Sequence, residues 1–503
     1  MESEMIHKVV AFCYVSALSI GLHGCYSYDC RELATCAGYI EIPDDLSCDP
    51  AAGGIRAECP GIFVSSSIGD DDGAGTRDNP VRTLSAAITA AQAGPGRVYA
   101  CAETFAEALI LPTGMEIWGG LDCAGSWRHI GDGSKTTIRP APGLIPVRVL
   151  AGSGRAMVGD IRAEAAHATQ PSGSSIAVII GTNSAVDILR SELIAGDGAR
   201  GAHGAPGGTT PAPDGNAGAP GAAACSASTV QGGAGAVNSC RGFDSVGGTG
   251  GSGNATVGGD GTKGTPEPYP NPSGAGLGGV GGDLCKYGEP GMWGAQGANG
   301  LGAVHTWGIS DLGWAGPAGQ DGADGRPGQG GGGGGGSPAG AASCGSILGG
   351  ASGGGGGAGG CGGAGGKGGG AGGASIGVLS LSDEVTIRAS SIRTGRGGEG
   401  GNGGLGQMRG AGGGPGLRGM GVNLSLNACD GGPGGDGGNG GSGGGGLGGP
   451  SVGILFPFGS TPLHDADIRT GEAGKGGLGG DPNVPGSAGQ DGVRADSLGV
   501  PPQ

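Results

Sequence analysis

Glycine at every third position, sustained over long stretches, constrains this chain more than any other feature. Glycine accounts for 133 of the 503 residues. It recurs at every third position from Gly288 to Gly300 and again from Gly471 to Gly480. In the richest parts the triplet becomes Gly-Gly-X, with X at Ala358, Cys361 and Ala364. Because glycine has no side chain, these stretches cannot fill a hydrophobic core, and an ordinary globular fold over the whole length is excluded.

A period of three fits an extended left-handed helix with three residues per turn and a rise of about 3.1 Å per residue. Each X column then projects along one edge, while the glycine edges let neighbouring segments approach and exchange N–H···O=C bonds. This pattern resembles the polyglycine II bundles of some insect antifreeze proteins and phage tail-fibre tips. A flexible linker is the first alternative, although a linker needs no period and residues 197–372 would be a very long structureless loop. Collagen is the second, indicated only by the Gly-X-Y triplets of residues 316–330.

Residues 61–196 have a different texture, with short apolar runs separated by glycine, proline and asparagine. Thr83–Gln92 (TLSAAITAAQ) predicts one amphipathic helix with Thr83 as its N-cap. The short runs that follow have the spacing of solenoid coils rather than of hairpins. They are Arg97–Cys101, Ala108–Leu111, Met115–Trp118, Thr136–Arg139, Val147–Leu150 and Met157–Ile161.

The start of this region carries a short strand at Ile62–Val64, the sequence G-T-x-x-N-P-V-R-T-L from Gly75 to Leu84, and then the helix. This order resembles the start of right-handed parallel β-helix proteins of the pectate-lyase-like superfamily, over roughly residues 61–195. The resemblance implies a mostly β fold class. The expected fold is a right-handed parallel β-helix solenoid with long glycine-rich insertions that are polyglycine II-like or disordered.

A repeated motif indicates where the solenoid resumes after each insertion. The sequence Gly-Ser-Ser-Ile-Ala-Val at 173–178 recurs in related form at 373–378 and 449–454. A glycine that opens a glycine-rich run follows 20 or 21 residues after the serine of each copy, at Gly196, Gly395 and Gly471. The unit from the serine to this glycine is about one coil long. The predicted organisation is a lipoprotein signal peptide (1–24), a Cys-rich tether (25–60), the β-helix with its capping helix (61–196), a glycine-rich insertion (197–372), a returning coil (373–395), a second insertion (396–448), a second returning coil (449–471) and a glycine-rich tail (472–503).

The N-terminus predicts export with a lipid anchor. Val9–Leu22 is an uncharged run after Lys8, too short to span a bilayer and of the length of a signal h-region. It ends in Leu-His-Gly-Cys25, which resembles a bacterial lipobox and implies cleavage before Cys25 and lipid attachment to its sulfur. Tyr26 in the next position favours the outer membrane, by analogy with Gram-negative lipoproteins. Secretion with Cys25 in a disulfide and an uncleaved anchor remain as alternatives.

Fourteen cysteines in an exported chain predict disulfides, and no pair has the C-x2-C spacing of a zinc site. Sequence neighbours are the first expectation for pairing, although sequence does not fix the connectivity. The expected pairs are Cys48–Cys59, Cys101–Cys123, Cys225–Cys240 and Cys344–Cys361.

The charge and the scattered polar residues bear on nucleic-acid binding and on catalysis. The net charge of −16 lacks the basic footprint of nucleic-acid binding. Glycine creates G-x-S-x-G matches without the strand-to-helix context of a catalytic serine, so no catalytic residue is predicted. Asp160, Arg162, Asp187 and Arg190 are the candidates that a polysaccharide-cleaving β-helix would use.

An acidic turn supplies the candidate metal ligands. Asp70, Asp72 and Asp78 carry the oxygen ligands that Ca²⁺ prefers. The plainer interpretation is an exposed Asp-rich turn without a metal.

Together these features predict a lipid-anchored cell-surface protein with a structural or adhesive role and no catalysis. Its texture resembles that of PGRS-type glycine-rich surface proteins. The expected partners are the membrane, through the lipid, and glycans or other envelope proteins. The alternative is a carbohydrate-active β-helix protein that binds or cleaves polysaccharides, with glycine-rich spacers. Recognition of an ice or mineral surface is a third hypothesis.

Overall fold

The computed structural model describes residues 48–501 except 269, 307, 341–343, 345–346 and 460. The predicted signal peptide, Cys25 and most of the tether therefore lie outside the described residues. The chain divides into two compact units, residues 1–53 and 54–503. In the first unit the described part is the short 3₁₀ helix η3 (Pro50–Ala52), which Asp49 caps through a hydrogen bond to the N–H of Ala51.

Three parallel sheets form the body of the second unit, so the fold is mostly β. The first sheet contains β1 (Ile62–Val64), β2 (Arg97–Cys101), β5 (Glu116–Asp122), β9 (Arg155–Gly159), β12 (Ala185–Leu189), β19 (Val385–Arg388) and β22 (Leu463–His464). The second contains β3 (Thr104–Phe105), β7 (Thr136–Ile138), β10 (Ile161–Glu164), β13 (Glu192–Ile194), β20 (Ser391–Arg393) and β23 (Asp467–Arg469). The third contains β4 (Leu109–Leu111), β8 (Val147–Val149), β11 (Ser175–Ile180), β18 (Ser375–Ser380), β21 (Ser451–Pro457) and β24 (Arg494–Val500). Strand β6 (Arg128–His129) adds an antiparallel pair to β5.

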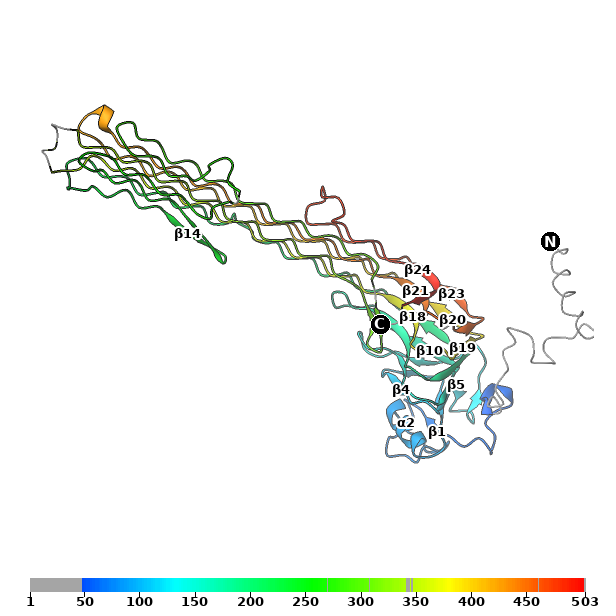
Figure 1. The fold of residues 1–503 in the computed structure, drawn as a ribbon. Helices are drawn as coiled ribbons and strands as arrows, with labels where there is room; N and C mark the ends of the chain where they lie inside the picture. Colours follow the sequence, from blue (N-terminus) through cyan, green and yellow to red (C-terminus); the bar gives the residue numbers. More distant parts are fainter. Residues whose placement is uncertain are drawn as a thin grey trace, which may run out of the picture. The chain divides into compact units, whose positions relative to one another are not determined.

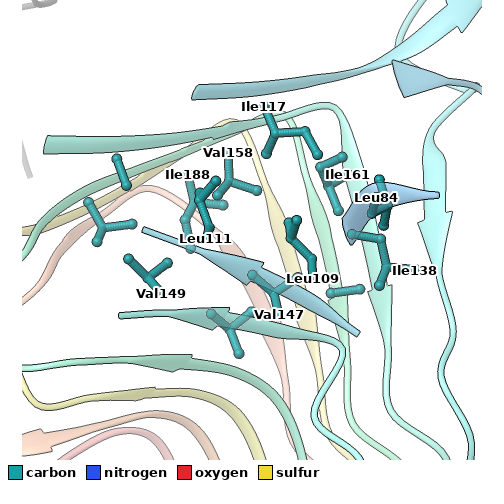
Figure 2. Packing of buried hydrophobic residues seen from close by; sticks show 14 of the residues in the cluster. Leu84, Leu109, Leu111, Ile117, Ile138, Val147, Val149, Val158, Ile161 and Ile188 are labelled. Atoms are coloured by element: carbon teal, nitrogen blue, oxygen red, sulfur yellow. The ribbon is translucent and has the colours of Figure 1, made fainter. Parts of the chain in front are cut away.

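The chain visits the three sheets in a fixed order, so that β9, β10 and β11 belong to the first, second and third sheets and β12 returns to the first. Alternate side chains of each strand point inward and form one apolar core between the sheets. Figure 2 shows this core, with Ile117, Val158 and Ile188 of the first sheet facing Leu109 and Val147 of the third. We call one pass of the chain through the three sheets a coil. Each coil is short, but the stacked coils together supply a continuous core.

Helix α2 (Leu84–Gln92) covers the end of this core, as the sequence predicts. The Thr83 side chain accepts a hydrogen bond from the N–H of Ala86, which is the expected N-cap contact. Leu84, Ile88 and the small residues between them are buried against β1, β2 and β4.

The repeated motif lies in the third sheet and aligns in register. Ser175 of β11 pairs with Ser375 of β18, which pairs with Ser451 of β21. Each glycine-rich run leaves after a strand of the second sheet and returns at a strand of the third: β13 to β18, β20 to β21 and β23 to β24. We call the extended segments of these three runs the glycine bundle. Figure 1 shows them running side by side.

Residues 350–373 form the central segment of the bundle. The N–H groups of the successive residues Gly353, Gly354 and Gly355 donate to carbonyls of Gly251, Cys429 and Ala219. Their own carbonyls accept from the N–H groups of Gly233, Gly334 and Gly416. These six partners belong to six different segments, so the central segment is surrounded by six neighbours at Gly353–Gly355.

Close approach, rather than a special φ, requires glycine in this segment. A Cβ on Gly353, Gly354 or Gly355 would lie about 2 Å from a carbonyl oxygen of a neighbouring segment (1.9, 2.0 and 2.1 Å respectively). Real Cβ atoms do not approach backbone atoms so closely. The regular spacing of glycine is therefore a packing requirement.

Two short hairpins and a turn of 3₁₀ helix decorate the bundle. The hairpins are β14 (Val237–Cys240) with β15 (Phe243–Val246), and β16 (Gly308–Ser310) with β17 (Gly313–Ala315); the helix is η4 (Leu424–Leu426). Trp314 of β17 packs in a second apolar cluster against the outer face of the third sheet, beside Ile176 and Ile376. This cluster joins the base of the bundle to the body.

Disulfides correct part of the sequence-based expectation. Bonds between described residues are Cys101–Cys123, Cys225–Cys344, Cys240–Cys361 and Cys285–Cys429. The first is as expected, whereas the expected Cys225–Cys240 and Cys344–Cys361 pairs are wrong. The chain turns back between these sequence neighbours, so each cysteine lies beside a segment about 120 residues away, at separations of 119 and 121 residues. Cys48 and Cys59 are disulfide-bonded as well.

Two adjacent glycines provide a matched test of this packing. A Cβ on Gly413 would lie 2.0 Å from the carbonyl oxygen of Asn216, whereas a Cβ on Gly414 would meet no atom within 4 Å. We expect Gly413→Ala to lower the free energy of unfolding by about 1–3 kcal/mol through overpacking, and Gly414→Ala to leave it unchanged. Guanidinium denaturation of the oxidised chain measures both, and equal midpoints would contradict the packing described.

Candidate functional site

The acidic turn before α2 organises the helix start. Asp70, Asp72 and Asp78 are exposed, and one oxygen of Asp70 accepts the N–H of Asp72. The structure does not gather these three carboxylates into a group: within the described residues, the one cluster with metal-ligand spacing is formed by others. Asp71 makes the ordered contacts, because it accepts the N–H groups of Arg82 and Thr83. Burial alone would raise the pKa of Asp71, but these hydrogen bonds hold it below its ordinary value.

Asp160 is the most buried carboxylate among the polysaccharide-cleaving candidates. It lies at the corner between β9 and β10 with a φ of 56°, a left-handed conformation that Asp tolerates better than most residues. Arg190 and Ala389 hold the same corner in the next two coils, with φ of 46° and 48°. The corner thus stacks Arg190 on Asp160, and their side chains meet.

Asp160 is neutralised from two directions. Lys135 Nζ lies 2.9 Å from Oδ1, and Arg190 Nη2 lies 2.7 Å from Oδ2. His129 Nε2 lies 3.2 Å from Oδ1. Burial by itself would raise the pKa of Asp160, but the hydrogen bonds and charges of Arg190 and Lys135 hold it below its ordinary value.

This cluster has the chemistry of a structural ion pair. His129, Asp132 and Asp160 have ligand atoms within 4.8 Å of one another, the spacing of a metal site. Lys135 and Arg190 already occupy both carboxylate oxygens of Asp160, however, so a metal ion at this position would have to displace a cation. A carboxylate held ionised by two permanent cations is also a poor general acid. The cluster therefore fastens β6 and the turn after it to the coil corners.

The other candidates lie apart from Asp160. The parallel register sets Asp187 beside Met157, and its carboxylate accepts from Arg155 at 2.6 Å. Arg162 lies in β10 of the second sheet and pairs with Glu192 at 3.1 Å. Asp160 follows β9 and Asp187 pairs with Met157 within β9, so the two carboxylates do not stack as a cooperating acid pair of a hydrolase would. Each acid has its own cation, so these residues form no pair of cooperating acids.

A hollow of about 400 Å³ opens beside the third sheet. Arg148, Thr182, Asp311, Leu381 and mostly apolar or backbone groups line it. Arg148 is occupied there by the backbone carbonyl of Asp311. The hollow lacks converging acids and bases, so it offers shape rather than catalytic chemistry.

Two exposed aromatic residues mark the surface of the glycine bundle, and the sequence analysis missed them. Trp293 is 66% exposed and Tyr287 is 57% exposed. The guanidinium of Arg409 lies 5.1 Å from the centre of the Trp293 ring, and Arg418 Nη1 lies 3.4 Å from the Tyr287 hydroxyl. Their spacing of six residues, two periods of the glycine pattern, was the available signal, because it sets both rings on one edge about 19 Å apart.

The two arginines are themselves held by acids of the next segment. Arg409 Nε lies 3.2 Å from Asp436, and Arg418 Nη1 lies 3.8 Å from Asp430. The Trp293 ring therefore rests against a cation that an acid holds in place, and Tyr287 contacts such a cation through its hydroxyl. Both side chains remain more than half exposed. Such fixed, exposed rings offer flat apolar faces with polar neighbours. We call Tyr287 and Trp293 the aromatic pair.

Comparisons of the chain with protein-family models, curated proteins and solved structures found no match. Across the described part of the chain, no helix has the length and apolar character needed to cross a membrane.

The Asp160 cluster gives a stability prediction. We expect Asp160→Asn to lower the free energy of unfolding by about 3–5 kcal/mol, because Lys135 and Arg190 lose their counter-charge in a buried place. Since the folded pKa of Asp160 is depressed, its contribution is present above the unfolded pKa of about 3.9 and is lost as pH falls further. Unfolding curves between pH 6 and 2.5 should therefore show a smaller decline at low pH for the variant than for the wild type. Asp132→Asn, at an exposed neighbour, is the control; an equal effect of both substitutions would contradict this role.

Proposed function

We propose that this chain is a lipid-anchored cell-surface protein of the outer membrane, with a structural and adhesive role and no catalysis. In this proposal the three-sheet body is a right-handed parallel β-helix, and the glycine bundle is a polyglycine II array that extends it as a stiff rod. The fixed visiting order of the sheets supports the first assignment, together with the strong right-handed preference of parallel crossovers. The bonding of Gly353, Gly354 and Gly355 to six different segments supports the second.

That six-fold bonding is the observation that carries the structural role. Where N–H and C=O groups are taken by six surrounding segments, as at Gly353–Gly355, the backbone is shielded from water and from proteases. Side chains at its rim further close the array. Asp324 and Asp321 accept the N–H groups of Gly365 and Gly368, and Asp214 accepts that of Ala411. A closed rod suits display at a distance from the envelope better than turnover of a substrate.

The adhesive part of the proposal rests on the aromatic pair. Flat rings exposed beside fixed arginines and acids suit the combination of apolar C–H faces and hydroxyl groups that glycans present. The partners we propose are therefore the membrane, through the lipid on Cys25, and a glycan on the surface of the bundle. Neither assignment requires a cofactor.

The anchor can be tested on Cys25. We expect the wild type expressed in a Gram-negative host to incorporate labelled palmitate and to sediment with outer membranes. Cys25→Ala should lose both properties, because the sulfur that accepts the lipid is absent. Cys13→Ala, within the apolar run, should keep them. Labelling that survives Cys25→Ala would sink the anchor assignment, and secretion of an unlabelled wild type would favour a disulfide at Cys25.

Adhesion can be tested on Trp293. We expect the protein to be retained on an insoluble glycan from a panel of envelope polysaccharides, and Trp293→Ala to weaken retention about tenfold, equivalent to about 1.4 kcal/mol. Phe458→Ala removes another exposed ring, on the body, and should have no effect. Release of new reducing ends from any glycan of the panel would instead favour the carbohydrate-cleaving alternative, and retention independent of Trp293 would contradict the role of the pair.

A further inference from the structure

One edge of the glycine bundle carries a continuous column of exposed, uncharged side chains. The column contains Leu405, Met408, Ala411, Gly414, Leu417 and Met420, at intervals of three residues. The backbone carbonyls of all six accept hydrogen bonds from the neighbouring segment, donated in order by Gly207, Ala212, Gly215, Gly218, Gly221 and Ala224. Apart from residues 208–211, which the ladder skips, the donors also follow at intervals of three, and the ladder sets the six residues on the same edge. We call them the 405–420 column.

The large side chains of this column are unusually open to solvent. Leu405 is 59% exposed, Met408 67%, Leu417 68% and Met420 58%. Exposed Pro206, Ala217, Pro220 and Ala223 line the adjacent edge of the neighbouring segment, and exposed Asp214 lies on the same edge beside Ala411. At about 3.1 Å per residue the column is about 46 Å long. A mainly apolar strip of this length, interrupted by one acid in a chain of net charge −16, marks an interaction surface rather than scattered exposure.

A further glycine-rich segment added to the array would need an open row of N–H donors along this edge. The N–H groups of Arg396 and Asn402, just before the column, are capped by Asp197 and His203. The N–H of Ala411, in the middle of the column, is capped by Asp214. An added segment would therefore meet a blocked donor at the centre of the column, whereas the protruding leucines and methionines on both sides of it offer apolar contact.

The order of side chains along the column is self-complementary. Reversing the column about its midpoint sets Leu405 opposite Met420, Met408 opposite Leu417 and Ala411 opposite Gly414. Large flexible side chains thus face each other at both ends, and the two smallest face each other in the middle. A two-fold axis between two copies of one surface produces this reversal.

We propose that the 405–420 column is a homodimer interface, in which two copies of this chain lie antiparallel along it. With a width of two segments, each about 4.8 Å, the strip covers about 440 Å² on each copy. The total of about 900 Å² is below the range of stable specific interfaces and fits a weak, reversible dimer. This inference goes beyond the proposed function, because it depends neither on the lipid anchor nor on glycan binding.

The opposition of positions 408 and 417 allows a register-specific test. Sedimentation velocity of the purified, oxidised chain should reveal a concentration-dependent dimer. Met408→Glu and Leu417→Lys should each raise the dimer dissociation constant about 100-fold, since each introduces a charge at two symmetry-related contacts, at about tenfold per contact. The double variant should recover dimerisation, because the two new charges of opposite sign face each other across the axis. Leu284→Glu, at a leucine that is 92% exposed elsewhere on the bundle, is the control and should dimerise like the wild type.

Other outcomes overturn the proposal. A wild type that remains monomeric at 100 µM would do so, and so would single variants that dimerise normally. A double variant no better than the singles would exclude the antiparallel register. Each variant is exposed at the substituted position, and its melting temperature is measured alongside to exclude a folding defect. If the wild type is monomeric but binds phosphatidylethanolamine–phosphatidylglycerol vesicles through Met408, the column faces lipid instead of a second copy.

Discussion

The rest of this structure depends on one constraint: neighbouring backbones in the bundle approach so closely that no Cβ fits between them. A strand in a sheet bonds to two neighbours in one plane, whereas Gly353, Gly354 and Gly355 bond to six neighbours around the segment. Cohesion therefore needs no side-chain core. Glycine pays heavily for this in conformational entropy on ordering. The disulfides Cys225–Cys344 and Cys240–Cys361 offset part of that loss by closing loops of more than 100 residues.

The three-sheet body fixes where each glycine-rich run begins and which runs lie next to each other. Stacked coils are separated by about 4.8 Å, the spacing of hydrogen-bonded strands. Every glycine-rich run leaves the same corner of successive coils, so its first residues are already at bonding distance: Gly198 donates to Arg396, and Gly397 donates to Glu472. The three-sheet core thus acts as a template that sets segments in register before any glycine-to-glycine contact forms. Because the runs return to neighbouring strands, both ends of each run are fixed.

The sequence predicted the features that are local or periodic. The Thr83 cap, the solenoid runs and the period of three follow from residues close in the chain. The lateral order of the segments did not follow, because one glycine edge is like another and only distant residues distinguish them. This is why the pairing of Cys225 was misjudged. Asp160 was recognised as a candidate, but its pairing with Arg190 depends on the left-handed corner that stacks successive coils, which no local pattern reveals.

The X positions then decide what each edge of the bundle can do. Where X is Asp, Asn or His, as at Asp321 or Asp214, the side chain bends back to cap a backbone N–H, and the edge is closed to further segments. Leu447 is an X residue buried in the second apolar cluster, but the Leu and Met side chains of the 405–420 column and Trp293 stand in solvent, at a cost that a purely structural rod would avoid with alanine. Both kinds of edge occur on the same array. The apolar and aromatic edges are therefore best explained as contact surfaces. The capped edges cannot bind a further segment, so contact is confined to the apolar and aromatic edges.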